Sequence, residues 1–318
     1  MKAAPRLLVS VRSRAEAELA HASGVSIIDF KEPDRGALGP VAPEILEDCM
    51  SAFPKAMLSV VLGEVGEVDS GAQGSESTVG SDLTERSDLS GESGPTGVWE
   101  STGHPEVACA IELTAGRGLG FLKLGVDFGD ARQQPRPTGV SSPERDPTRP
   151  NKVQNPEPYP KVTALQATAS GTAALRRIEQ ACALVAPAVA AGDRVILVFY
   201  AEQTLPLQFL PLLAARGVHG VMLDTRKKHG PSLLGCQPKA SLRAFVEAAR
   251  ATGLTVGLAG RLRLDDLPEI AALGPDVIGM RGGLCRQSVR TGALDPGAVA
   301  AALAALTTTF STADIEGG

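Results

Sequence analysis

Eight short apolar runs alternate with amphipathic segments along this chain of 318 residues. Alternating strands and helices predict parallel strands joined by right-handed crossovers, and eight such units most simply close into a (β/α)₈ barrel of the TIM type. An open doubly wound sheet is the rival fold, but no Gly-x-Gly-x-x-Gly turn follows the first run. The expected strands are Arg6–Ser10, Val25–Phe30, Met57–Leu62, Gly120–Leu124, Arg194–Phe199, Gly220–Leu223, Thr255–Leu258 and Asp276–Met280.

The segments between these runs carry helix signals. Ser13-x-x-Glu16 is a capping box that opens the first expected helix. Glycine supplies the left-handed conformation that stops a helix, and five expected helices end on one just before the next strand. These glycines are Gly24, Gly192, Gly217, Gly253 and Gly274.

Two stretches, 67–106 and 130–161, break the regular pattern. The first holds nine Asp or Glu residues against one Arg, and the second holds eight prolines. Neither has apolar periodicity, so we expect both to be disordered inserts in one barrel domain over 1–318. Without their 40 and 32 residues, 246 remain, close to the roughly 250 of a typical barrel of this type.

The overall composition excludes several classes of function. A net charge of -5 and an aromatic content of 3% argue against binding of nucleic acid or of an anionic membrane surface. The longest apolar stretch, 181–191, is too short to span a bilayer, and no secretory signal is visible, so we expect a cytoplasmic protein. Five scattered cysteines without a CxxC pair indicate neither a disulfide framework nor a metal site. The sequence leaves open whether the protein forms a homo-oligomer.

Charged residues stand where the even-numbered strands end. Asp29 and Lys31 are two apart and so share one face, Lys123 interrupts an apolar run, and Asp224 closes another. Because even strands contribute to the same layers of a barrel interior, these four side chains are expected to converge on one pocket. An Asp–Lys pair at a strand end can be merely a salt bridge at the rim, but lysine within an apolar strand is rarely buried without a reason.

Such a cluster suits carbonyl chemistry. A lysine in apolar surroundings, or beside another cation, loses proton affinity and becomes a nucleophilic amine. It can then form an iminium with a carbonyl substrate, while neighbouring aspartates move protons.

Glycine-rich turns follow the last two strands, at residues 257–260 and 279–283. Glycine lets backbone N–H groups approach an anion closely, and barrels of this type commonly hold a substrate phosphate at this place. We therefore expect Gly260, Gly282 and Gly283 to bind phosphate, with Arg281 gripping it through its guanidinium.

These same residues resemble the signatures of the (5-formylfuran-3-yl)methyl phosphate synthases, which make the furan precursor of methanofuran. The resemblance covers the whole barrel outside the two inserts. Its most specific motif is Asp29-Phe-Lys31-Glu-Pro-x-x-Gly36-x-Leu38-Gly39. It also rests on Tyr200-Ala201-Glu202, Lys123-Leu-Gly125, Asp224-Thr225-x-x-Lys228, Leu258-Ala-Gly260 and Gly279-x-Arg281-Gly282.

The resemblance implies a lyase that condenses two molecules of glyceraldehyde 3-phosphate, with loss of phosphate and water. It implies Lys31 as the Schiff-base lysine, Lys123 and Lys228 as assisting cations, and Asp29 and Asp224 as proton-transfer residues, with no metal or organic cofactor. The inserts depart from the family pattern, because they follow the third and fourth strands on the expected catalytic face.

Two other functions stay open. One is a different phosphosugar enzyme on the same barrel, either a class I aldolase or an isomerase that uses only aspartate acid–base chemistry. The other is a catalytically inactive barrel that serves as a binding subunit, with the inserts as interaction arms. The full set of lysines and aspartates argues against the second.

Overall fold

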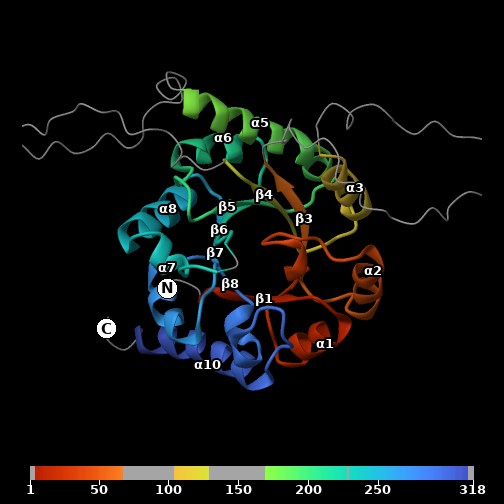
Figure 1. The fold of residues 1–318 in the computed structure, drawn as a ribbon, viewed down its shortest axis with the longest axis vertical. Helices are drawn as coiled ribbons and strands as arrows, with labels where there is room; N and C mark the ends of the chain where they lie inside the picture. Colours follow the sequence, from red (N-terminus) through yellow and green to blue (C-terminus); the bar gives the residue numbers. More distant parts are fainter. Residues whose placement is uncertain (1–3, 67–103, 129–168, 228, 314–318) are drawn as a thin grey trace, which may run out of the picture.

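The chain forms a closed barrel of eight parallel strands in sequential order (Figure 1). A computed structural model describes residues 4–66, 104–128, 169–227 and 229–313. The strands are β1 (Arg6–Val11), β2 (Ile27–Phe30), β3 (Leu58–Val65), β4 (Phe121–Val126), β5 (Val195–Tyr200), β6 (Gly220–Asp224), β7 (Thr255–Leu258) and β8 (Val277–Met280). The first and last strands pair, with Leu8 opposite Gly279, so the (β/α)₈ fold class is confirmed.

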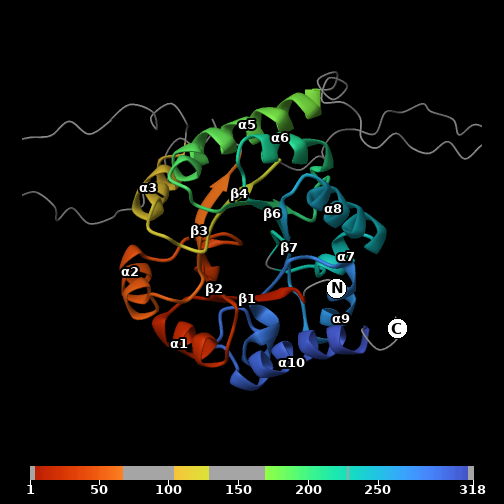
Figure 2. The ribbon, with the colours of Figure 1, turned by 180° about the vertical axis from the view of Figure 1, so that it is seen from behind.

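Helices surround the barrel as a ring (Figures 1 and 2). They are α1 (Arg14–Ala22), α2 (Pro43–Ala52), α3 (Pro105–Thr114), α5 (Ala169–Ala190), α6 (Leu210–Ala215), α7 (Leu233–Cys236), α8 (Lys239–Ala251), α9 (Leu267–Leu273) and α10 (Pro296–Ala313). Short 3₁₀ turns lie in the connections: η1 (Pro33–Arg35), η3 (Leu207–Phe209), η4 (Leu264–Asp266), η5 (Gly282–Leu284) and η6 (Arg286–Ser288).

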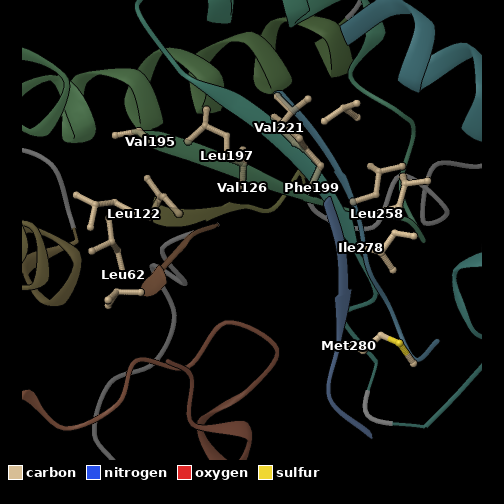
Figure 3. Packing of buried hydrophobic residues seen from close by; sticks show 14 of the residues in the cluster. Leu62, Leu122, Val126, Val195, Leu197, Phe199, Val221, Leu258, Ile278 and Met280 are labelled. Atoms are coloured by element: carbon tan, nitrogen blue, oxygen red, sulfur yellow. The ribbon is translucent and has the colours of Figure 1, made fainter. Parts of the chain in front are cut away.

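Successive side chains along each strand point alternately outward and inward, and this creates two apolar layers. Outward residues such as Val195, Leu197 and Val221 belong to the larger cluster between strands and helices (Figure 3). Inward residues fill the barrel itself and form a separate cluster with the β2–α2 loop. Its strand residues are Leu8, Ile27, Val61, Phe121, Ile196, Val198, Tyr200, Met222 and Val277. Side chains that replace apolar ones in this inner layer are therefore placed to form a site.

The sequence signals for helix ends hold in the structure. Each of the five predicted stop glycines has a positive φ, between 77° and 86°. Ser13 caps α1 by accepting the backbone N–H of Glu16. The Glu16 carboxylate does not complete the capping box, however: it accepts the backbone N–H of Arg12 and pairs with Arg281.

The third strand is longer than predicted. It continues to Val65 because the register with β4 shifts between Val61 and Gly63, where Gly63 has a φ of 117°. This bulge turns Glu64 to face Gly125. The second predicted insert, 130–161, lies wholly outside the described residues, as does the first up to residue 103. The predicted end of the first insert at residue 106 is too late, because α3 begins at Pro105.

No helix in the part of the chain that the structure describes is long and apolar enough to cross a membrane. The cysteines form no disulfide among the described residues, and Cys49, Cys182 and Cys285 are buried.

The barrel closes through hydrogen-bonded strands that lie outside both predicted inserts. A variant without residues 70–102 and 132–158, rejoined by short Gly/Ser links, should therefore keep one cooperative thermal transition. Loop length alone changes stability little, by about 0.6 kcal/mol per doubling. Calorimetry of both proteins checks this, and a broad, non-cooperative transition in the deletion variant would show that an insert belongs to the core.

Candidate active site

A cavity of about 440 Å³ opens at the carboxyl ends of the strands. Its lining includes Lys31, Lys123 and Asp224 from the even strands, so these predicted residues do converge. The lining also includes all four predicted phosphate-binding residues: Gly260, Arg281, Gly282 and Gly283. Asp29 is fully buried in the barrel beside Lys123. Lys228 lies outside the described residues.

Asp29 and Lys123 form an ion pair inside the barrel. The Lys123 Nζ donates to Asp29 Oδ2 at 2.6 Å, and the exposed fractions of the two residues are 2% and 0%. Ser10, opposite Asp29 on β1, donates its hydroxyl to the same oxygen at 2.9 Å. On the other side, Ser59 of β3 faces Asp29. Asp29 Oδ1 and Ser59 Oγ are both buried without a hydrogen-bond partner among the described residues, so one carboxylate oxygen is left open to a further donor.

The Lys123 amine has a perturbed proton affinity. Burial lowers its pKa, and the nearby Lys31 ammonium lowers it further, while Asp29 acts in the opposite direction. The Lys123–Asp29 pair therefore holds a proton less firmly than a lysine in water does. It can pass that proton toward the cavity.

Lys31 is held more loosely than Lys123. Its Nζ lies 3.4 Å from Asp224 Oδ2, whereas Asp224 Oδ1 is fixed by the backbone N–H of Thr225 at 2.7 Å. The Lys31 backbone is anchored by its N–H to Val11. A fixed carboxylate and a weakly held amine at the cavity wall form the geometry needed for attack on a carbonyl with proton transfer close by.

The predicted glycine turns bring three loops into close contact. Gly260, at a φ of 118°, packs on Thr225 so tightly that a Cβ atom would lie 2.8 Å from its methyl group. A Cβ atom at Gly283 would lie 2.4 Å from the carbonyl oxygen of Leu262. The glycines thus let the loops after β6, β7 and β8 meet around the cavity.

The predicted role of the Arg281 guanidinium needs correction. All three of its nitrogen atoms donate to protein acceptors, including both oxygens of Glu16, at 2.8 and 3.3 Å. Further bonds go to the carbonyl oxygens of Ser10, Arg290 and Gly292. A side chain saturated in this way has no N–H left for a bidentate grip on phosphate. Its carboxylate partner is Glu16 of α1.

Glu202, part of the Tyr-Ala-Glu signature, supports the site from outside the cavity. Its carboxylate accepts the backbone N–H groups of Arg226 and Lys227 at 3.0 to 3.1 Å. It thereby holds the loop that follows Asp224. Its neighbour Tyr200 is buried opposite Asp224, and burial together with Glu64 raises the pKa of the Tyr200 hydroxyl.

The cavity is strongly cationic although the chain is acidic overall. Among the described lining residues are seven cationic side chains and two carboxylates, Asp34 and Asp224, and two of the cations, Lys123 and Arg281, are paired with Asp29 and Glu16 behind the lining. The cations are Lys31, Lys123, Lys227, Arg261, Arg263, Arg281 and Arg290. Such a lining favours an anionic ligand. The described residues contain no cluster of His, Cys, Asp or Glu side chains arranged to hold a metal ion.

Comparisons with known proteins identify sequence relatives and a shared fold. The sequence model of the 4-HFC-P synthase family matches residues 7–81 and 150–303. A Methylorubrum extorquens protein, provisionally named a (5-formylfuran-3-yl)methyl phosphate synthase, is 33% identical over 96% of this chain and 92% of its own length. A Methanosarcina acetivorans protein of that name is 28% identical over 90% and 93%. The solved structure of KGPDC from Streptococcus mutans has a TM-score of 0.50, covering 97% of this chain and 100% of that one, at 11% identity. It shares the fold.

Asp29→Asn should lower the free energy of unfolding by about 3–5 kcal/mol, since it leaves the buried Lys123 without its counter-charge. The loss should shrink as pH rises from 7 to 10. The pKa of Lys123 is already lowered in the folded state, and removing Asp29 removes the interaction that raises it. The unfolded lysine, with a pKa of about 10.4, then binds more protons than the folded one, so stability rises with pH.

Urea unfolding of the wild type and the variant at several pH values measures this slope. The double variant Asp29→Asn/Lys123→Met is the control, because without the amine the extra slope should disappear. An Asp29→Asn protein whose stability follows the wild-type pH profile would contradict the buried pair.

Proposed function

Because this chain belongs to the 4-HFC-P synthase family, we propose that it is a (5-formylfuran-3-yl)methyl phosphate synthase. In this proposal it condenses two molecules of glyceraldehyde 3-phosphate: one is isomerised, an aldol-type step joins the pair, and cyclisation follows with loss of phosphate and water. The observation that carries the proposal is the loosely held Lys31 amine beside Asp224, above the buried Lys123–Asp29 pair.

Lys31 is proposed as the nucleophile. Its amine adds to the substrate carbonyl, and loss of water gives an iminium that acidifies the neighbouring carbon. Asp224 lies close enough to accept that proton, with Oδ2 at 3.4 Å from the lysine nitrogen. An amine with a single long hydrogen bond is freer to react than Lys123, which is locked to Asp29 at 2.6 Å.

The Lys123–Asp29 pair is proposed to serve as proton donor and acceptor for the later steps. Its burial and the proximity of Lys31 make the Lys123 proton mobile. Lys228 keeps the assisting role that the family resemblance implies. The cationic lining of the cavity supports substrates that each carry a phosphate.

Two other functions compete with this proposal. A class I aldolase or an aspartate-only isomerase would use the same barrel and the same phosphate loops. An inactive binding subunit would need none of the lysine chemistry. Purified protein is incubated with glyceraldehyde 3-phosphate, alone and together with dihydroxyacetone phosphate, and the products are identified by mass spectrometry. The synthase yields the furan phosphate from glyceraldehyde 3-phosphate alone, and an isomerase yields only dihydroxyacetone phosphate. An aldolase yields a condensed sugar phosphate only when both trioses are present, and a binding subunit yields no product.

Borohydride added during turnover should fix a triose phosphate adduct on Lys31. Peptide mapping by mass spectrometry locates the adduct. Lys31→Arg should be inactive, with no adduct, because a guanidinium keeps its charge at neutral pH and cannot act as a nucleophile. Lys239→Arg, on the exposed surface of α8, is the matched control and should keep full activity. An adduct on Lys123 would reassign the nucleophile, and turnover without any adduct would favour enolisation without covalent catalysis.

A further inference from the structure

The loop after β8 forms a compact excursion at the mouth of the cavity. Its base is closed by an antiparallel bridge between Cys285 and Leu294, and Arg286 N–H donates to Ala293 at 3.0 Å. We call residues 286–293 the β8 loop. Residues 288–291 line the cavity, and Gln287 and Ser288 both have a φ of 57°. Non-glycine residues in this conformation persist only where the surroundings impose it, which often marks a functional loop.

Two arginine side chains hold the backbone of the β8 loop in place by hydrogen bonds. Arg281 Nε donates to the carbonyl oxygen of Arg290 at 2.6 Å, and Arg12 Nη1 donates to that of Thr291 at 3.2 Å. Arg281 is itself held by Glu16, and it is 6% exposed. The saturated guanidinium of Arg281 thus fixes the position of another arginine, Arg290.

The Arg290 side chain reaches across the mouth to the β2–α2 loop. Its Nη2 donates to the carbonyl oxygen of Gly36 at 3.0 Å. Its Cβ lies close to Gly282, at 3.5 Å from where a Cβ atom of that glycine would stand, which is ordinary van der Waals contact. Within the described part of the chain, no carboxylate forms an ion pair with it.

Arg290 differs from the other cations at the rim in its burial. Lys227, Arg261 and Arg263 are exposed, whereas Arg290 is half-buried. Burial and the neighbouring Arg281 and Arg261 cations lower its pKa, whereas Asp224 and Asp34 act in the opposite direction, and the guanidinium stays charged at neutral pH. A partly desolvated cation gains more from an anion than an exposed one, because water screens it less.

We propose that Arg290 is the side chain that binds the phosphate group of a phosphate-monoester substrate, and that Arg281 is its positioning residue. Nη2 keeps its contact with Gly36 while other N–H groups of the guanidinium point to the anion. This inference rests on the proposed function only for the source of the phosphate, a triose phosphate. The anion site itself follows from the cavity, the pinned loop and the half-buried guanidinium.

The test is binding of inorganic phosphate to the whole protein by titration calorimetry. Arg290→Gln should raise the Kd for phosphate roughly 10- to 100-fold, as loss of a charge-assisted contact predicts. Arg290→Lys should fall between, since it keeps the charge without the planar fork. Arg286→Gln is the matched control: Arg286 is exposed on the same loop and does not line the cavity. Its Kd should equal that of the wild type.

Equal phosphate affinity in the wild type and a folded Arg290→Gln protein overturns the proposal. If Arg290→Gln lowers the Tm, the Arg290→Lys variant decides. The proposal is also overturned if a fully stable Arg290→Lys protein binds phosphate with the wild-type Kd and is still inhibited by phosphate. Arg281→Gln should lower both the Tm and the phosphate affinity. A loss of Tm with unchanged affinity removes its positioning role.

Phosphate binding needs no turnover, so the two proposals fail separately. If Arg290→Gln raises the Kd for phosphate but the wild type forms no furan phosphate, the anion site stands and the proposed reaction is refuted. Furan phosphate formation with the same KM for glyceraldehyde 3-phosphate in wild type and Arg290→Gln refutes the anion site alone.

Discussion

The buried contact between Asp29 and Lys123 is the constraint on which the site depends. Two opposite charges in an apolar barrel are costly to desolvate, and they persist only with good geometry and further hydrogen bonds. The structure supplies both: a 2.6 Å pair, and the Ser10 hydroxyl on the same carboxylate oxygen. Apolar inward residues such as Ile27, Val61 and Phe121 fill the same interior layer, so water screens the pair less than it would screen an exposed one. Lys31 and Asp224 form a second, looser pair at 3.4 Å, and this difference in hydrogen bonding is the basis for the separate roles proposed for the two lysines.

Much of this arrangement could be predicted from local patterns. The fold follows from eight apolar runs, and the convergence of Lys31, Lys123 and Asp224 follows from the period of a strand and the layers of a barrel. A lysine within an apolar run is a strong signal, because burying it demands a partner.

The rest could not be predicted because it depends on contacts between distant segments. Glu16 carries a capping-box signal, and nothing local indicates that its carboxylate binds Arg281, 265 residues away. An arginine beside two glycines looks free to bind phosphate until that partner is known. Arg290 lies in a loop whose sequence has no apolar periodicity. Only the hydrogen bonds that hold the backbone of this loop show where the Arg290 side chain points. The bulge at Gly63 likewise depends on pairing with β4.

The Arg281–Glu16 contact also joins the first and the last βα unit of the barrel. Glu16 lies in the first helix, Arg281 directly follows the eighth strand, and the same guanidinium binds the carbonyl oxygen of Ser10. These contacts exist only after β8 has paired with β1. Because a chain is synthesised from its amino terminus, this is the last pair of strands that can form. Contacts of such long sequence separation are slow to form. During synthesis, the first seven strands therefore emerge before the support of the β8 loop exists, and the final βα unit completes the ring and the mouth of the cavity together.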